Sequence, residues 1–294
     1  MDTTQIGWVV ENRYAQASHL LSKIGGLFMN SQYEMFIDLV HRRMSVRKLK
    51  SAPLPEGAIE KILEAGRWAM SGANGQPWEY IVVTDPAVKQ RLFKHYLDEL
   101  NCDYNFWMEQ IRVPELRHPA YQLAGEPEEQ IRTLKSRSGW AEAPALIVVL
   151  GDGRRQWATV MGGHTFGRHQ SHLTDGLANT CMLIHLAAAA MGLGTQWVTL
   201  HIEDGFKRIL NVPDVMTIYT IIPVGYPDVP PRKEGVRRPL IDMIHYNQYD
   251  HNKYMTHRQM VEYISELRRK TKPKYAESIE GKGETIPGTE HKPD

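Results

Sequence analysis

The chain has 294 residues, and its 35 basic and 34 acidic side chains give a formal net charge of +1. This balance argues against a polyanionic partner such as nucleic acid or an anionic membrane, while the length allows one large domain or two small ones with a sizeable core. The two cysteines, Cys102 and Cys181, are too far apart in sequence to indicate a disulfide framework or a thiolate zinc site. We see neither a signal-peptide pattern nor an apolar run of spanning length, so we expect a soluble, cytoplasmic protein.

Composition divides the chain into three parts. Residues 1–30 carry scattered apolar side chains, and we predict an N-terminal arm that packs on the domain. Residues 31–248 carry most of the regular apolar periodicity and are predicted to form one domain, within which residues 98–172 contain an irregular insertion or lid. Residues 249–294 are predicted to form a charged C-terminal helix followed by a polar tail.

Apolar periodicity predicts the helices and strands of the central part. Helices are expected over 32–43, 55–69, 85–96, 174–191 and 256–269, and strands over 80–83, 145–150, 195–200 and 216–226. The helix over 174–191 is small and apolar on nearly every side. Such a helix requires burial all round, which favours a second subunit packed against it.

A basic stretch follows the first predicted helix. Arg43, Ser45 and Arg47 alternate, so an extended backbone would project them to one face, where two guanidinium groups and a hydroxyl could hold a phosphate. The alternative is a solvated basic helix end, which the helix dipole favours. A second basic doublet, Arg237 and Arg238, follows a proline-rich loop near the end of the predicted domain.

A loop of small residues joins the 55–69 helix to the strand that follows. It contains Ser71, Gly72 and Asn74, whose backbone and polar groups could approach a flat heterocycle closely. A structural turn is the alternative, because glycine and asparagine are common in turns.

Aromatic and histidine residues gather in and after the insertion. His164, His169 and His172 have no acidic partner nearby in the sequence and no established ligand spacing, so we expect no metal there. We predict that this region contacts an aromatic substrate. The candidates are Tyr104, Trp107, Trp157, Arg168 and His169.

Four separated stretches together resemble the FMN-dependent nitroreductase family. Arg43 to Arg47 is similar to the family's Arg-Arg-Ser-x-Arg motif, with Met44 in place of the second arginine. Residues 69–78 (AMSGANGQPW) resemble its small-residue loop, with Met70 where proline is usual. The Gly-Leu-Gly at 192–194 and the Gly-Tyr-Pro followed by Val-Arg-Arg-Pro at 236–239 complete the series in order, so the resemblance covers about residues 35–245.

The resemblance implies an α+β fold, with a central, mainly antiparallel sheet wrapped by helices, in an intertwined homodimer with two FMN sites at the subunit interface. Arg43, Ser45, Arg47 and either Arg237 or Arg238 would hold the phosphate, ribityl chain or pyrimidine edge. The loop after residue 70 would meet the ribityl chain and ring, and the strand after Gly194 would pass the flavin N5, where a backbone N–H or the Thr199 hydroxyl could bond. The implied cofactor-binding residues are Arg43, Met44, Ser45, Arg47, Ser71, Gly72, Asn74, Val198, Thr199, Arg237 and Arg238.

The resemblance also implies a function. NADH or NADPH would reduce the flavin, and a small aromatic acceptor such as a nitroaromatic or quinone would then take the electrons in ping-pong order. Thr199 is the one residue with a possible catalytic contact, at N5. The alternatives are reductive dehalogenation of a halogenated phenol, a flavin-binding or flavin-cleaving protein, and an interaction protein with a decayed site.

Overall fold

The computed structural model describes residues 31–97, 140–155, 169–200, 202–229, 237–264 and 266. The chain divides into two compact units, residues 1–42 and residues 43–294. In the first unit residues 31–42 are helical, which confirms the first predicted helix, and Arg42 Nε lies 2.7 Å from Asp38 Oδ2 one turn earlier.

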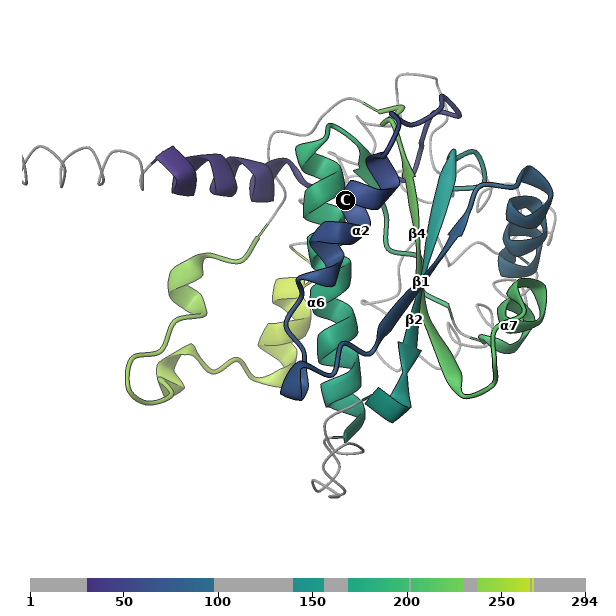
Figure 1. Cartoon of the computed structure of the whole chain (residues 1–294). Helices are drawn as coiled ribbons and strands as arrows, with labels where there is room; N and C mark the ends of the chain where they lie inside the picture. The colour runs from purple at the N-terminus through teal and green to yellow at the C-terminus, as the bar shows by residue number, and fades with distance from the viewer. Residues whose placement is uncertain are drawn as a thin grey trace, which may run out of the picture. The chain divides into compact units, whose positions relative to one another are not determined.

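The second unit is built on a four-stranded antiparallel sheet (Figure 1). Its strands are β1 (Trp78–Val83), β2 (Ala145–Asp152), β3 (Gly194–Thr195) and β4 (Met216–Gly225), in the order β1-β2-β4-β3. The two central strands, β2 and β4, are rich in β-branched residues, as expected for strands that are covered on both faces. The predicted α+β class and mainly antiparallel sheet are confirmed.

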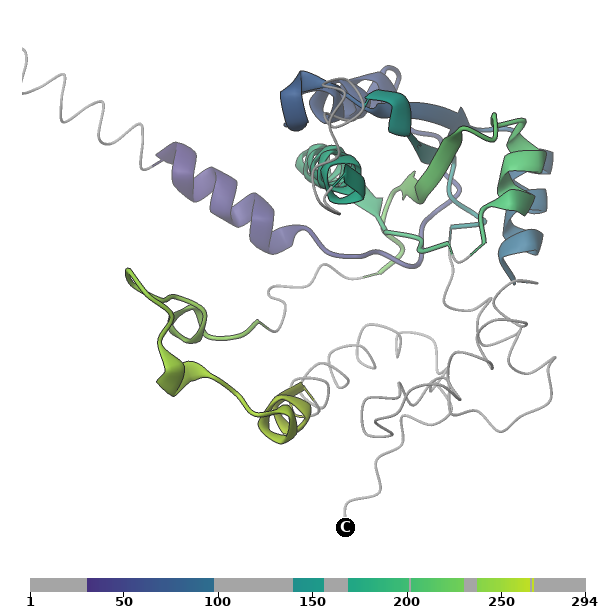
Figure 2. The ribbon, with the colours of Figure 1, turned by 90° about the horizontal axis from the view of Figure 1, so that it is seen from below.

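Alternate side chains of β2 enter two separate cores. Ile147 and Val149 pack with α2 (Ala58–Arg67) and α6 (His169–Ala190) on one face of the sheet. Leu146 and Val148 face the other side, where they pack with the helix over 86–97 and with α7 (Asp204–Leu210). Figure 2 shows these helices on either side of the sheet. The unit therefore has three layers, and every β2 residue is buried.

Two predicted elements differ from the observed ones. The long helix α6 begins at His169, so Thr174 and Asp175 lie inside it and do not cap it. The strand predicted over 195–200 is interrupted: β3 ends at Thr195, and pairing with β4 resumes only at the single bridge from Val198 to Ile221. The β-branched pattern there is that of a strand, but Trp197 turns instead toward His185 and Tyr219.

The C-terminal described segment, residues 237–264, contains short helical elements. These are η5 (Leu240–Asp242), η6 (His251–Lys253) and a helix over 257–264, close to the start of the helix predicted over 256–269. Across the described ranges we find no helix with both the length and the apolarity needed to span a membrane.

Candidate functional site

The basic stretch is extended and lies along β3. Val46 N donates to the Thr195 carbonyl at 2.8 Å, and Ser45 pairs with Thr195 as a parallel bridge. Further along, Lys50 N donates to the Tyr226 carbonyl at 2.9 Å. The approach is close: a Cβ built on Gly194 would lie 2.9 Å from the Val46 side chain, so only glycine fits without movement.

The extended backbone sorts the side chains of this stretch by face. Val46 is buried, and Met44 packs against the same core cluster, so both lie on the core side. Ser45 and Arg47 are exposed and Arg43 is half-buried. This is the alternation expected of an extended chain. Met44 therefore occupies a packing position, whereas Arg43, Ser45 and Arg47 lie on the face away from that core.

The second basic stretch lies near enough to the first for the charge of Arg237 to act on Arg43. Partial burial is the main cause that lowers the pKa of Arg43, and the positive charge of Arg237 lowers it further. Arg238 is engaged elsewhere: its Cζ lies 5.6 Å from the centre of the Tyr263 ring, and its Nη2 donates to the Asp242 carbonyl at 3.5 Å. Between Arg237 and Arg238, which the sequence left open, the geometry favours Arg237 as the partner of Arg43.

A buried histidine lies near Arg43. His185 Nδ1 is 2.7 Å from Thr195 Oγ1, and Trp197 stacks on the imidazole with ring centres 6.1 Å apart. Burial, and next the charge of Arg43, lower the pKa of His185 to about 4. The imidazole is therefore neutral at physiological pH. The sequence analysis did not single out His185, although an isolated imidazole in a long apolar helix could have suggested a buried polar contact.

The segment expected to pass the flavin N5 carries two candidate residues, Val198 and Thr199, and they differ in how accessible they are. Val198 N already donates to the Ile221 carbonyl at 3.0 Å, and the Val198 carbonyl accepts from Thr220 Oγ1 at 2.9 Å. The side chain of Val198 is buried in the core. Thr199 is exposed, so of the pair it is the residue whose side chain is accessible to a ligand.

The small-residue loop between α2 and β1 has an unusual backbone. Three of its residues other than glycine have positive φ: Ala73 at 51°, Asn74 at 53° and Gln76 at 47°. The Ser71 hydroxyl accepts from Gln76 N at 3.0 Å, and Asn74 N donates to the Ser71 carbonyl at 3.1 Å. Left-handed conformations cost alanine and glutamine free energy, and such residues concentrate at functional sites. Gly72 and Asn74 are exposed, and Ser71 is half-buried.

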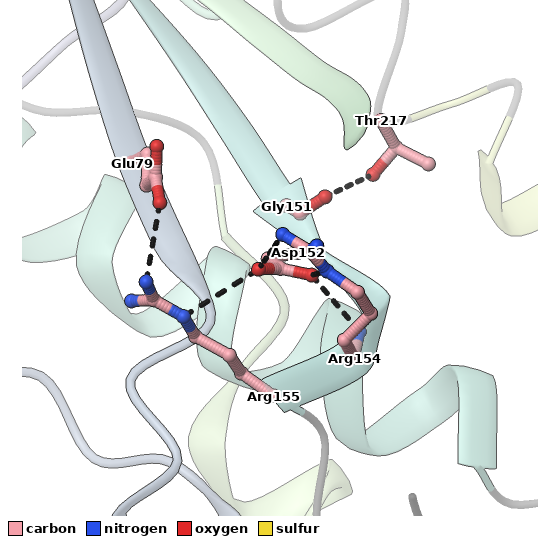
Figure 3. A network of polar contacts seen from close by, with 6 residues as sticks. All are labelled: Glu79, Gly151, Asp152, Arg154, Arg155 and Thr217. Carbon is pink, nitrogen blue, oxygen red and sulfur yellow. Dashed lines mark hydrogen bonds and ion pairs between the residues drawn. The ribbon is translucent and has the colours of Figure 1, made fainter. Parts of the chain in front are cut away.

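A charged network lies at the end of β2, next to this loop (Figure 3). The buried Asp152 carboxylate accepts from Arg154 Nε at 2.8 Å and lies 3.5 Å from Arg155 Nε, and Arg155 also pairs with Glu79 on β1 at 3.4 Å. Hydrogen bonds from Arg154 hold the pKa of Asp152 below its usual range. The Arg155 carbonyl lies so close to Gly75 that a Cβ there would overlap it.

The loop and the arginine pair belong to opposite edges of the sheet. The loop leads directly into β1, which is one edge strand, whereas Ser45 pairs with β3, the other edge strand. Helix α6 contacts both regions: Asn179 Nδ2 donates to the Met70 carbonyl at 3.1 Å, and His185 lies beside Arg43. Within one chain the sheet thus separates the two groups of candidate residues.

The candidate substrate contacts cannot be placed in the same way. Tyr104, Trp107, Trp157 and Arg168 lie outside the described residues, as does most of the expected insertion or lid. His169 is the first residue of α6, and its side chain lies outside the described part.

Comparison with known proteins gives consistent matches. A model of the Nitroreductase family matches residues 40–226, more than half of the chain. Iodotyrosine deiodinase 1 of Rattus norvegicus is 25% identical over 224 residues, which cover 74% of this chain and 70% of that protein. Iodotyrosine deiodinase of Daphnia pulex is 27% identical over 218 residues, covering 72% and 66%. A crystal structure of oxidized iodotyrosine deiodinase bound to FMN and 3-iodo-L-tyrosine shares the fold, with a TM-score of 0.53 and 22% identity over 73% of this chain and 100% of that one.

Proposed function

Because the chain belongs to the nitroreductase family, we propose that it is an FMN-dependent oxidoreductase that passes electrons from NADH or NADPH to a small aromatic acceptor. Nitroaromatics and quinones are the acceptor classes that we propose first. The observation that carries the proposal is that Arg43 and Arg237, from opposite ends of the predicted domain 31–248, lie close enough for the charge of one to act on the other.

The arginine pair fits the phosphate end of FMN. Two like charges close together repel each other, and partial burial of Arg43 makes this more costly. A bound dianion offsets both costs, and guanidinium groups match phosphate oxygens in geometry. Ser45 and Arg47 extend from the same face of the stretch and add a hydroxyl and a third cation. Neutral His185 adds no further positive charge to the site.

The other candidate residues suit the rest of the cofactor. The exposed backbone at Gly72 and the polar groups of Ser71 and Asn74 would bind the ribityl chain and ring edge, and the Thr199 hydroxyl would contact the ring near N5. Bound FMN supplies the exchange of electrons with a donor and an acceptor. The protein's own task is then to bind and orient, and we assign no side chain as a nucleophile.

We further propose that the active form is a homodimer in which each FMN contacts both copies. The separation of the Ser71–Asn74 loop and Arg43 across the sheet supports this, because a loop from a second copy could complete the site. Exposed apolar side chains support it as well: Met70, just before the loop, is 79% exposed, and Met182 on α6 is 50% exposed. Contact with a second copy would bury both.

Spectroscopy of the purified protein tests this function. We expect a flavin absorbance spectrum after incubation with FMN and gel filtration, and anaerobic bleaching of that absorbance by NADH or NADPH. Addition of a nitroaromatic or quinone should then restore the absorbance. A protein that binds FMN but is not bleached by either nucleotide would instead be a flavin-binding protein, and one that stays colourless would refute the proposal.

Reductive dehalogenation of a halogenated phenol is the second candidate. Similarity to iodotyrosine deiodinases from several animals favours it, and the exposed Thr199 hydroxyl is available beside the expected ring position. The test is anaerobic incubation of the reduced holoenzyme with 3-iodo-L-tyrosine and with a simple halogenated phenol. Release of halide at a rate above that of nitroaromatic reduction would favour this activity.

A further inference from the structure

Arg238 is held by two groups of the C-terminal segment. Its Nη2 donates to the Asp242 carbonyl at 3.5 Å, and its Cζ lies 5.6 Å from the centre of the Tyr263 ring. A guanidinium over an aromatic face is attracted by the charge distribution of the ring. The buried Tyr263 hydroxyl has no hydrogen-bond partner within the described ranges, so the contact depends on the ring and not on the hydroxyl.

The turn next to Arg238 is fixed from further along the segment. Lys253 Nζ donates to the Ile241 carbonyl at 2.7 Å and to the Ile244 carbonyl at 2.6 Å. One ammonium group therefore satisfies two carbonyls of the chain that follows Arg238, and it ties η6 to η5.

The helix that carries Tyr263 has a defined start. Thr256 N donates to Gln259 Oε1 at 2.9 Å, and Gln259 N lies 3.4 Å from Thr256 Oγ1. These reciprocal bonds form a capping box, which satisfies backbone donors at a helix N-terminus. The ring of Tyr263 is thus presented to Arg238 from an ordered helix.

This segment lies beyond the part of the chain that the family model matches, which ends at residue 226. Yet Arg237, next to Arg238, is the residue whose charge acts on Arg43. Because Arg43 and Arg237 carry like charges and repel each other, contacts that hold the chain around Arg237 in place help to keep them close. Anchoring of the adjacent Arg238 is one such contact.

We propose that Tyr263 is a positioning residue for the phosphate end of FMN, which acts by holding Arg238 and thereby fixing Arg237 opposite Arg43. This inference rests on the proposed function. It assigns the C-terminal segment 237–264 a role in cofactor affinity, and it divides the arginine doublet between a ligand contact at Arg237 and an anchor at Arg238.

The test compares FMN with riboflavin, which lacks the phosphate, in fluorescence titrations of the full chain. Tyr263→Leu is expected to raise the Kd for FMN about threefold to fivefold and to leave the Kd for riboflavin unchanged. Tyr263→Phe keeps the ring and should bind FMN like the wild type. Tyr246→Leu, which removes an exposed tyrosine of the same segment, is the matched control and should also bind FMN normally.

A second pair of variants distinguishes loss of the Arg238 contact from general damage to the fold. In an Arg238→Leu protein, addition of Tyr263→Leu should weaken FMN binding no further, because the contact is already lost. Unchanged FMN affinity in Tyr263→Leu would overturn the inference, as would equal weakening of FMN and riboflavin, and in both cases the proposed function would stand. A wild-type protein that binds neither flavin would remove the proposed function itself.

Discussion

His185 Nδ1 and Thr195 Oγ1 lie 2.7 Å apart, with both side chains almost completely buried. The backbone carbonyl of the same threonine accepts a hydrogen bond from Val46 N. Thr195 therefore contacts both His185 and the stretch that carries Arg43. The neutral imidazole therefore lies close to Arg43 without adding a positive charge there.

We predict that His185 makes the protein sensitive to mild acid. Its pKa is about 4 in the folded protein and about 6.5 when exposed, so the unfolded chain binds more protons between these values. Stability should therefore fall as pH is lowered from about 6.5 to about 4, by up to roughly 3 kcal/mol. Urea unfolding at several pH values should show this slope in the wild type.

His185→Gln should lack that component, so the stability difference between variant and wild type should shrink toward pH 4. The exposed His257, replaced in the same way, is the control and should leave the slope intact. A constant difference between His185→Gln and wild type across this range would contradict the prediction.

Arg43→Gln should weaken FMN binding far more than riboflavin binding. Loss of one charged hydrogen-bond donor to phosphate corresponds to about tenfold to a hundredfold in Kd. Arg42→Gln removes a neighbouring arginine that pairs with Asp38 on the exposed first helix, and it should leave both affinities nearly unchanged. Fluorescence titration measures both ligands, and equal effects of the two variants would argue against a phosphate contact at Arg43.

Gly194→Ala should destabilise the fold by about 1–3 kcal/mol, because the new methyl group would overlap the Val46 side chain. The double variant with Val46→Ala should recover part of this loss, since it removes Cγ1 and Cγ2 of Val46, two of the three atoms that the new methyl group would overlap, and leaves only Cβ. Gly153→Ala, with open space around the added methyl, is the control. Thermal unfolding is measured for the wild type, for Gly194→Ala, Val46→Ala and Gly153→Ala, and for the double variant. The prediction fails if the losses of Gly194→Ala and Val46→Ala simply add in the double variant.

Asp152→Asn should loosen the support of the Ser71–Gln76 loop. We expect a stability loss of about 1 kcal/mol near neutral pH, because the partners Arg154 and Arg155 are largely in solvent. The pKa of Asp152 is depressed, so its contribution is present above the usual carboxyl range and is lost as pH falls below it. The deficit of the variant should therefore vanish in acid, and faster amide exchange at Asn74 would report the loosened loop.

Local sequence patterns predicted much of this architecture. Beta-branched runs identified β1, β2 and β4, and the alternation of Arg43, Ser45 and Arg47 anticipated an extended stretch with its cationic side chains on one face. These features depend on neighbours in the sequence. The left-handed backbone at Ala73 and Gln76 was not foreseeable, because neither residue favours it. The close contact of this loop with the Arg155 carbonyl, at Gly75, likewise depends on a segment distant in the sequence.

Features that depend on distant residues were missed or left open. The bond from Val198 N to the Ile221 carbonyl uses one of the backbone N–H groups of the segment expected to pass N5, and nothing local in the sequence indicates it. The choice between Arg237 and Arg238 likewise depended on Tyr263, a residue outside the predicted domain. Contacts between distant segments of the chain determine both the hydrogen bond of Val198 and the different roles of Arg237 and Arg238.

The Ser71–Asn74 loop precedes one edge strand of the sheet, whereas Arg43 lies along the other. This separation bears on how the holoprotein should be handled. If two copies are needed to complete each site, retention of the yellow colour will depend on protein concentration. Strong dilution should release FMN together with free subunits, and reconstitution should then follow second-order kinetics in the polypeptide.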